Sequence, residues 1–109
     1  MNDYTYADPE TYTHLDTGGI KQERGKLQWS LVPWDAMEQV VKVLMYGAKK
    51  YNPDNWKKVY QSDPTLYADA MIRHCISYHK GERVDAETGL SPLASVICDA
   101  LFLLWGDEQ

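Results

Sequence analysis

One carboxylate stands in the middle of the most apolar stretch of this 109-residue chain. Asp99 lies within residues 93–105, which are apolar on nearly every side of a helix, and a helix that is apolar all round is normally buried. A buried carboxylate is costly unless a cation, a metal ion or hydrogen bonds compensate it. Asp99 is therefore a candidate metal ligand and catalytic residue. The alternative is a core aspartate that is hydrogen-bonded to the backbone, to His74 or to Arg73.

Three further acidic residues crowd a short segment between two predicted helices: Glu82, Asp85 and Glu87. Glu82 and Asp85 are three positions apart, so one helical turn would point both side chains the same way. Hard cations such as Mg²⁺ prefer oxygen ligands of this kind. The alternative interpretation is an acidic loop that is simply solvated.

Glu38 begins a charged stripe along the first predicted helix. At about 100° per residue, Glu38, Lys42 and Lys49 fall within roughly 40° of one another. A carboxylate in this place could hold a metal ion while the lysines hold a phosphate. The alternative is an ordinary ion pair on a solvated helix face.

His74 and Arg73 lie side by side in the second predicted helix. His74 falls on its apolar face, where it is either a ligand-binding residue or a hydrogen-bonded core histidine. Arg73 either pairs with Asp69 or binds a phosphate, because its planar guanidinium suits phosphate oxygens.

The elements that position these residues are predicted to be helices. The spacing of apolar residues and the proline and capping positions predict helices over about 33–51, 64–80 and 91–105, with a short extra turn near Trp56. No segment alternates like a half-buried strand over a useful length. We therefore expect an all-α fold, a small helical bundle of three main helices.

The polar first part of the chain differs from the rest. Residues 1–30 carry scattered tyrosines and Gly18-Gly19, which predicts an extended N-terminal arm, whereas residues 31–109 form the helical domain. A core this small is expected to be completed by oligomerisation, as a homodimer or a homotetramer.

Composition excludes several classes of protein. The net charge of −5 argues against a nucleic acid polymer as partner. The apolar runs are too short for a membrane span, and the N-terminus lacks a signal-peptide pattern. Cys75 and Cys98 lie among apolar residues of predicted helices, which favours reduced core thiols. We expect a cytoplasmic protein.

Several runs of the sequence are similar to one known family. They are Gly25-Lys26-Leu27, Leu31-Val32-Pro33, Glu38, residues 43–51, Asn55-Trp56, Asp69-Ala70, Arg73-His74, Gly81-Glu82, Asp85, residues 87–90 and residues 100–104. This pattern resembles the dATP/dGTP diphosphohydrolases, a family of small, mostly phage proteins similar to the MazG-like all-α nucleoside triphosphate pyrophosphohydrolases. The resemblance covers about residues 18–105.

The resemblance implies an oligomeric enzyme that uses Mg²⁺ or Mn²⁺. It would hydrolyse a purine deoxynucleoside triphosphate to the monophosphate and pyrophosphate. MazG-like enzymes bind metal through a Glu-x-x-Glu pair and a Glu-x-x-Asp pair, and Glu38 and Asp99 resemble a member of each. Val41 and Val96 stand at the other positions. The resemblance then implies either a metal site rebuilt from Glu38, Glu82, Asp85 and Asp99, or lost catalysis.

The remaining candidate residues would bind the substrate. Phosphate oxygens would be held by Lys26, Lys49, Lys50 and Arg73, with His74 also at the site, whereas Trp56 would stack on the base and Asn55 would read its edge. The alternative function is a phage protein that sequesters a nucleotide signal without hydrolysing it. A third hypothesis is a helical interaction module whose acidic cluster only confers solubility.

Overall fold

A computed structural model describes residues 12–14, 16–23 and 25–109. The chain divides into two compact units, residues 1–32 and residues 33–109. Tyr4 and Tyr6, two tyrosines of the predicted arm, lie outside the described residues.

The first unit contains a small antiparallel hairpin. Strand β1 (Tyr12–His14) pairs with β2 (Ile20–Gln22), with residue 14 opposite Ile20. Gly18, at φ +87°, supplies a left-handed backbone conformation in the connection. A single 3-10 turn, η1, follows at Trp29–Leu31. The sequence analysis did not predict this hairpin, because strands of three residues are too short to produce a readable alternation.

The second unit consists of four helices, which confirms the all-α class. They are α1 (Trp34–Lys50), α2 (Asn55–Ser62), α3 (Thr65–His79) and α4 (Pro92–Asp107). The turn expected near Trp56 is in fact α2, a helix of two turns. Helix α4 begins as predicted, with proline in its first turn and the Ser91 hydroxyl accepting a hydrogen bond from the Leu93 N–H at 3.2 Å.

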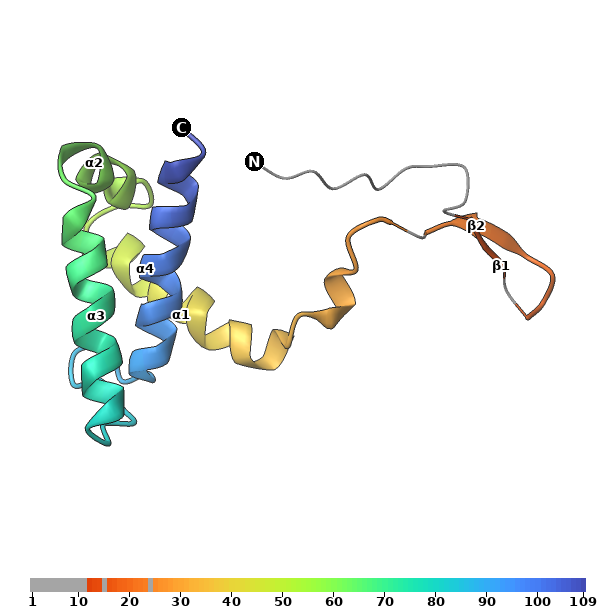
Figure 1. Ribbon diagram of the computed structural model, residues 1–109. Coiled ribbons are helices and arrows are strands. Elements are labelled where there is room, and N and C mark those ends of the chain that lie inside the picture. Colours follow the sequence, from red (N-terminus) through yellow and green to blue (C-terminus); the bar gives the residue numbers. More distant parts are fainter. Residues whose placement is uncertain (1–11, 15, 24) are drawn as a thin grey trace. The chain divides into compact units, whose positions relative to one another are not determined.

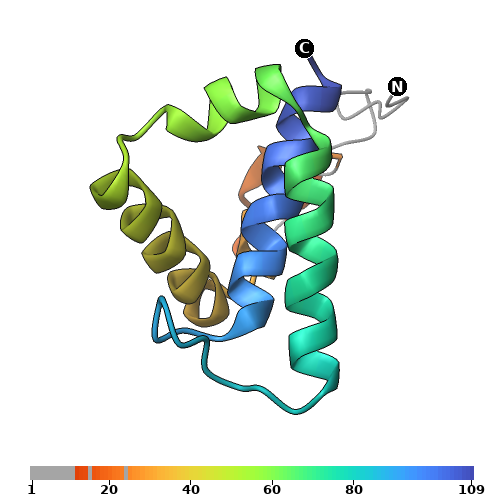
Figure 2. The same cartoon turned by 90° about the vertical axis from the view of Figure 1, so that its left-hand side faces the viewer.

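Helix α4 is the centre of this unit. It runs antiparallel to α3 and packs most extensively against it (Figure 1). It also contacts α1, and α2 closes the end of the unit where α4 finishes (Figure 2). Its neighbours account for the apolar character of most of α4, whereas Ile97 and Leu104 remain 41% and 58% exposed.

The hydrophobic core lies where α1 meets α4. Val40, Ala94 and Cys98 are buried, and partly buried side chains of α1 and Phe102 pack around them. The Cys98 thiol donates to the Val40 carbonyl at 3.4 Å. Burial raises the pKa of Cys98 to about 12, which keeps it a thiol. Cys75, by contrast, is exposed, so the expectation of two core thiols holds for one of them.

An aromatic cluster joins α2 to the C-terminal half of α4. The Trp56 ring stacks on Phe102 with 4.5 Å between centroids and meets Trp105 edge-on at 4.9 Å. The Tyr60 ring lies against Gly106, where a Cβ atom would overlap it. Gly106 therefore permits the close approach of α2. None of the described helices is long and apolar enough to cross a membrane.

Candidate functional site

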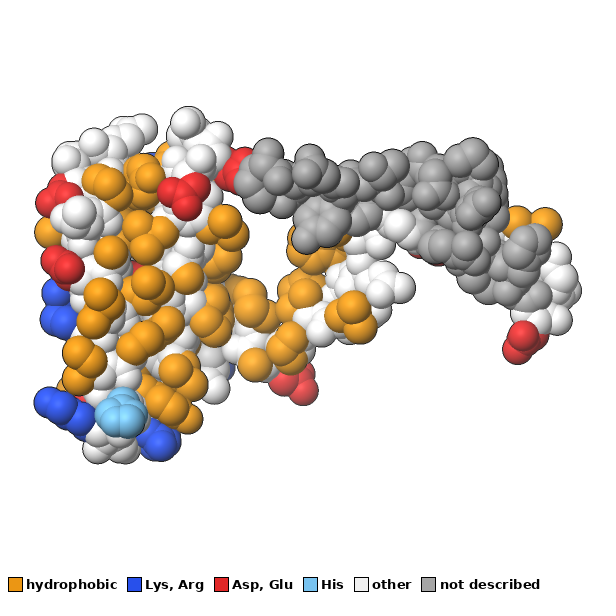
Figure 3. Space-filling model, in the orientation of Figure 1, with side chains coloured by type: hydrophobic (Ala, Val, Ile, Leu, Met, Phe, Trp, Pro, Cys, Tyr) orange, Lys and Arg blue, Asp and Glu red, His pale blue; other side chains and the backbone are white. Residues whose placement is uncertain are grey.

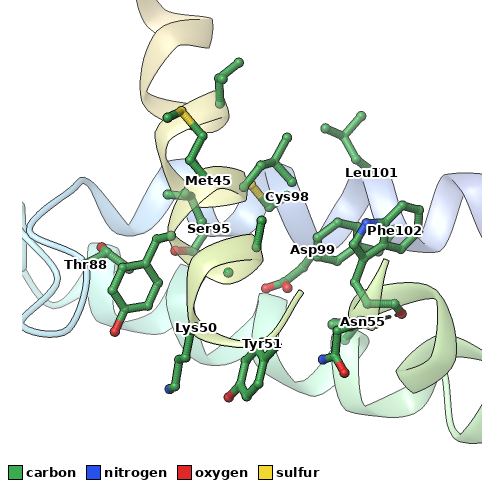
Figure 4. A pocket seen from close by; sticks show the side chains of 18 of the residues that line it. Met45, Lys50, Tyr51, Asn55, Thr88, Ser95, Cys98, Asp99, Leu101 and Phe102 are labelled. Carbon is green, nitrogen blue, oxygen red and sulfur yellow. Dashed lines mark hydrogen bonds between the residues drawn. The ribbon is translucent and has the colours of Figure 1, made fainter. Parts of the chain in front are cut away.

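A pocket of about 860 Å³ opens beside Asp99. Its walls come from the C-terminal half of α1, residues 51–56, α3, the loop around residues 85–88 and α4 (Figure 4). Pockets that bind small ligands typically measure roughly 300–1,000 Å³. The four helices and one loop thus create a cavity large enough for a molecule such as a nucleotide.

Asp99 is the buried polar group of this pocket. Its side chain points from α4 into the cavity, toward the side where Tyr51 and Asn55 lie (Figure 4). Only 7% of the residue is exposed, and its Oδ2 atom has no hydrogen-bond partner among the residues described. The alternative of a fully hydrogen-bonded core aspartate therefore does not describe this oxygen.

The electrostatics of Asp99 follow from its surroundings. Burial raises the pKa of Asp99 to about 7, although the positive charge of Arg73 acts in the opposite direction. Tyr67, which also lines the pocket, has its pKa raised to about 12, first by burial and then by the nearby Asp99 carboxylate. Asp99 thus lies close to its midpoint of ionisation at neutral pH.

The rim of the pocket carries exposed charge. Glu87 Oε2 accepts hydrogen bonds from Lys50 Nζ at 2.9 Å and from the Tyr46 hydroxyl at 3.0 Å. These contacts raise the pKa of Lys50 and of Tyr46 and lower the pKa of Glu87. About half of each side chain in the Lys50–Glu87 pair is accessible to solvent, so the pair is only weakly stabilising.

Asp85 organises the loop that presents Glu87. Its Oδ2 atom accepts hydrogen bonds from the backbone N–H groups of Glu87 and Thr88, at 3.0 and 2.9 Å, and from the Thr88 hydroxyl at 3.2 Å. Its backbone N–H donates to the Leu90 carbonyl at 2.7 Å. This carboxylate is therefore occupied by the loop itself.

The structure brings together about half of the site residues predicted from the sequence. Those that line the pocket are Lys50, Asn55, Trp56, His74, Asp85 and Asp99. They come from four helices and a loop, so their proximity depends on the tertiary fold.

The other predicted residues lie elsewhere. Glu38, Lys49, Arg73 and Glu82 are exposed and do not line the pocket, and Lys26 belongs to the first unit. The four carboxylates expected to hold a metal ion are therefore not gathered at the pocket. No group of three or more histidine, cysteine, aspartate or glutamate side chains that could hold a metal ion occurs within the described parts of the chain.

Several pocket residues were not candidates in the sequence. Tyr46 forms the rim contact with Glu87, which the sequence had singled out only as a cation ligand, and Tyr67, Thr88 and Ser95 line the cavity. One signal was available, because Tyr46 and Lys50 are four positions apart and share a helix face. No local sequence pattern links these two residues to their common partner Glu87, which lies 37 residues beyond Lys50.

Comparison with known proteins identifies the family. The sequence profile described as "dATP/dGTP diphosphohydrolase, N-terminal" matches residues 16–109. The chain belongs to the dATP/dGTP diphosphohydrolase family. This family member is 34% identical, over 87 residues, to a protein of Salmonella phage PMBT28 named dATP/dGTP diphosphohydrolase. The match covers 80% of this chain but 29% of the phage protein. No solved structure matches this chain.

Proposed function

We propose that this chain binds a purine deoxynucleoside triphosphate in the pocket beside Asp99. We further propose that it is part of a diphosphohydrolase. This enzyme would release the deoxynucleoside monophosphate and pyrophosphate in the cytoplasm of a phage-infected host. Family membership supports the reaction class, and the name of the phage relative supports dATP and dGTP as substrates. Because the chain spans less than a third of that relative, the activity of the longer protein remains part of the proposal.

One structural observation carries the binding proposal. A cavity of about 860 Å³ contains a carboxylate oxygen that is buried and has no partner among the described residues. Leaving such an oxygen unsatisfied is costly, and a ligand with suitable donors removes that cost. The ammonium group of Lys50 lies at the rim. It can bind phosphate oxygens when its hydrogen bond to Glu87 is broken.

The described residues of this pocket do not form a complete set of ligands for a metal ion. Asp85 is bonded to its own loop, Glu87 is paired with Lys50, and Glu38 lies outside the pocket. Mg²⁺ or Mn²⁺ stays a proposed cofactor that would arrive with the triphosphate, since Mg²⁺ is commonly held by substrate phosphates and few carboxylates. When bound it would neutralise phosphate charge.

We also propose that a second copy of the chain covers the apolar surface of α3 and α4. Hydrophobic side chains gather over these two helices (Figure 3). Ile72, Ile97 and Leu104 remain 53%, 41% and 58% exposed. An Ile97→Asp substitution is expected to convert a dimer to a monomer in light scattering, because it places a charge within this surface. A wild-type chain that is monomeric at all concentrations would contradict the proposal.

A direct assay tests the activity. The protein is incubated separately with dATP, dGTP, dCTP and dTTP, with Mg²⁺, with Mn²⁺ or with EDTA, and the products are separated by ion-exchange chromatography. We expect monophosphate and pyrophosphate from the purine substrates. Nucleotide that binds and is recovered intact would instead identify a sequestering protein, and no binding at all would refute both functions.

A further inference from the structure

The candidate pocket has two chemically different ends. At the enclosed end, Asp99 is only 7% exposed and its carboxylate points toward the side of Tyr51 and Asn55 (Figure 4), in a cavity that Trp56 and Phe102 also line. At the rim, Lys50 and Glu87 are about half exposed. A ligand that is apolar at one end and highly charged at the other therefore has one favourable orientation.

The triphosphate of a nucleotide suits the rim. It carries several negative charges, which are costly to remove from water at the enclosed end but can stay hydrated at the exposed rim. Lys50 offers a cation there, and its contact with Glu87 is weak enough to be exchanged because both groups are exposed. The base, which is neutral and flat, is the part of the ligand that can enter the enclosed end.

The Asp99 carboxylate then faces the edge of the base. Its orphaned Oδ2 atom needs a hydrogen-bond donor. Guanine presents two adjacent donors on its Watson–Crick edge, the N1–H and the N2 amino group, which match the two oxygens of a carboxylate. Adenine presents the N6 amino group as a single donor on that edge.

We infer that Asp99 is a specificity-determining residue that accepts hydrogen bonds from the donor edge of the purine base, with the phosphates at the Lys50 rim. This inference rests on the proposed function, because it assumes a nucleotide in this pocket. It differs from the expectation drawn from the sequence, in which Asp99 binds a metal ion at the phosphates. The two assignments place Asp99 at opposite ends of the substrate.

A nucleotide series separates these assignments. The ligands are the α,β-methylene analogues of dGTP, dITP and dATP, which resist cleavage between the α and β phosphates. The dITP analogue lacks only the N2 amino group of guanine. Dissociation constants are measured by calorimetry with Mg²⁺ and with EDTA, for the wild type, Asp99→Asn and the control Asp107→Asn. Asp107 is an exposed acid on the same helix and does not line the pocket.

The wild type is expected to bind the dGTP analogue about tenfold or more tightly than the dITP analogue, because a hydrogen bond to a charged group is lost. In Asp99→Asn this preference should fall below about threefold, since an amide has one acceptor oxygen where a carboxylate has two. Binding of the dATP analogue should be retained or improved, because an amide can both donate to and accept from an adenine edge. Asp107→Asn should behave as the wild type does.

Two results would overturn the inference. If Asp99→Asn weakens all three analogues by the same factor, and only when Mg²⁺ is present, Asp99 acts at the phosphates, and the proposed function survives. If the wild type binds none of the analogues, the proposed function fails as well. Circular dichroism of Asp99→Asn verifies that a loss of binding does not reflect unfolding.

Discussion

Asp85 and Asp99 both face the same pocket, but their surroundings make them opposites. Asp85 lies in a loop and accepts three hydrogen bonds on one oxygen, two from backbone N–H groups and one from the Thr88 hydroxyl. Asp99 lies on the buried side of α4, and its Oδ2 atom accepts none from the residues that the structure describes. The first carboxylate is used by the fold, whereas the second is available to a ligand.

The difference shows that proximity to a cavity does not define a functional carboxylate. A hydrogen-bonded carboxylate stabilises the conformation that supplies its donors. A buried carboxylate without donors destabilises the empty protein, and such a group is retained where a ligand uses it. The same substitution, aspartate to asparagine, should therefore change stability in opposite directions at the two positions.

The largest effect is expected at Asp99. Asp99→Asn should increase the free energy of unfolding at pH 8 by about 1–2 kcal/mol, because it removes a carboxylate whose ionisation is disfavoured by burial, which raises its pKa to about 7. The rate of dGTP hydrolysis at low substrate concentration should fall by about tenfold or more, owing to weaker binding. Urea unfolding and the product assay measure these two changes. A variant less stable than the wild type at pH 8 would contradict this prediction.

The pH dependence of stability should carry the signature of Asp99. Its pKa is about 7 in the folded protein, against 3.8 as its ordinary value. The folded state therefore binds more protons between these values, and the free energy of unfolding should decrease as pH rises from about 4 to 7. Above pH 7 this contribution becomes constant. The difference between wild type and Asp99→Asn isolates it, and a difference that is flat over this range would exclude the raised pKa.

At Asp85 the substitution should be harmful. Asp85→Asn is expected to lower the free energy of unfolding by about 1 kcal/mol, because the neutral amide oxygen that can replace Oδ2 accepts the three hydrogen bonds more weakly than a charged carboxylate does. Hydrogen exchange should increase for the amides of Glu87 and Thr88, because their acceptor is no longer charged. Unchanged stability and exchange would show that the loop does not depend on this carboxylate.

The smallest effect is expected at Glu87. Glu87→Gln weakens an exposed contact to Lys50 and Tyr46, and its thermal midpoint should shift by less than that of Asp85→Asn. Nucleotide binding should be equal to or tighter than in the wild type, because Lys50 is released for the phosphates. A loss of stability as large as that of Asp85→Asn would mean that the rim contact holds the loop.

The sequence predicted the helices and the burial of Asp99 for sound physical reasons. The apolar stretch around Asp99 required burial on several sides, and the capping Ser91 and the prolines marked the helix starts. The hairpin was missed because its strands are three residues long. Cys75 was expected in the core, but the face of α3 on which it lies is exposed in this chain.

The composition of the pocket was less predictable, because it depends on distances between elements. Glu38 and Glu82 were chosen for their spacing to neighbours along the chain, and spacing cannot show that both side chains lie outside the cavity. Asp85 was considered a metal ligand because hard cations prefer carboxylate oxygens. Its donors come from the loop that turns back on it, a geometry that local sequence does not reveal.

The ionisation of Asp99 tests the central claim most directly. Carbon-13 NMR of selectively labelled aspartate, assigned with Asp99→Asn and Asp85→Asn, follows each carboxyl group as pH changes, with and without the α,β-methylene analogue of dGTP. The claim predicts a midpoint near 7 for Asp99 in the free protein and a lower midpoint when the guanine donors bind its ionised form. A midpoint near 4 in the free protein, unchanged by nucleotide, would contradict a buried carboxylate that awaits a ligand.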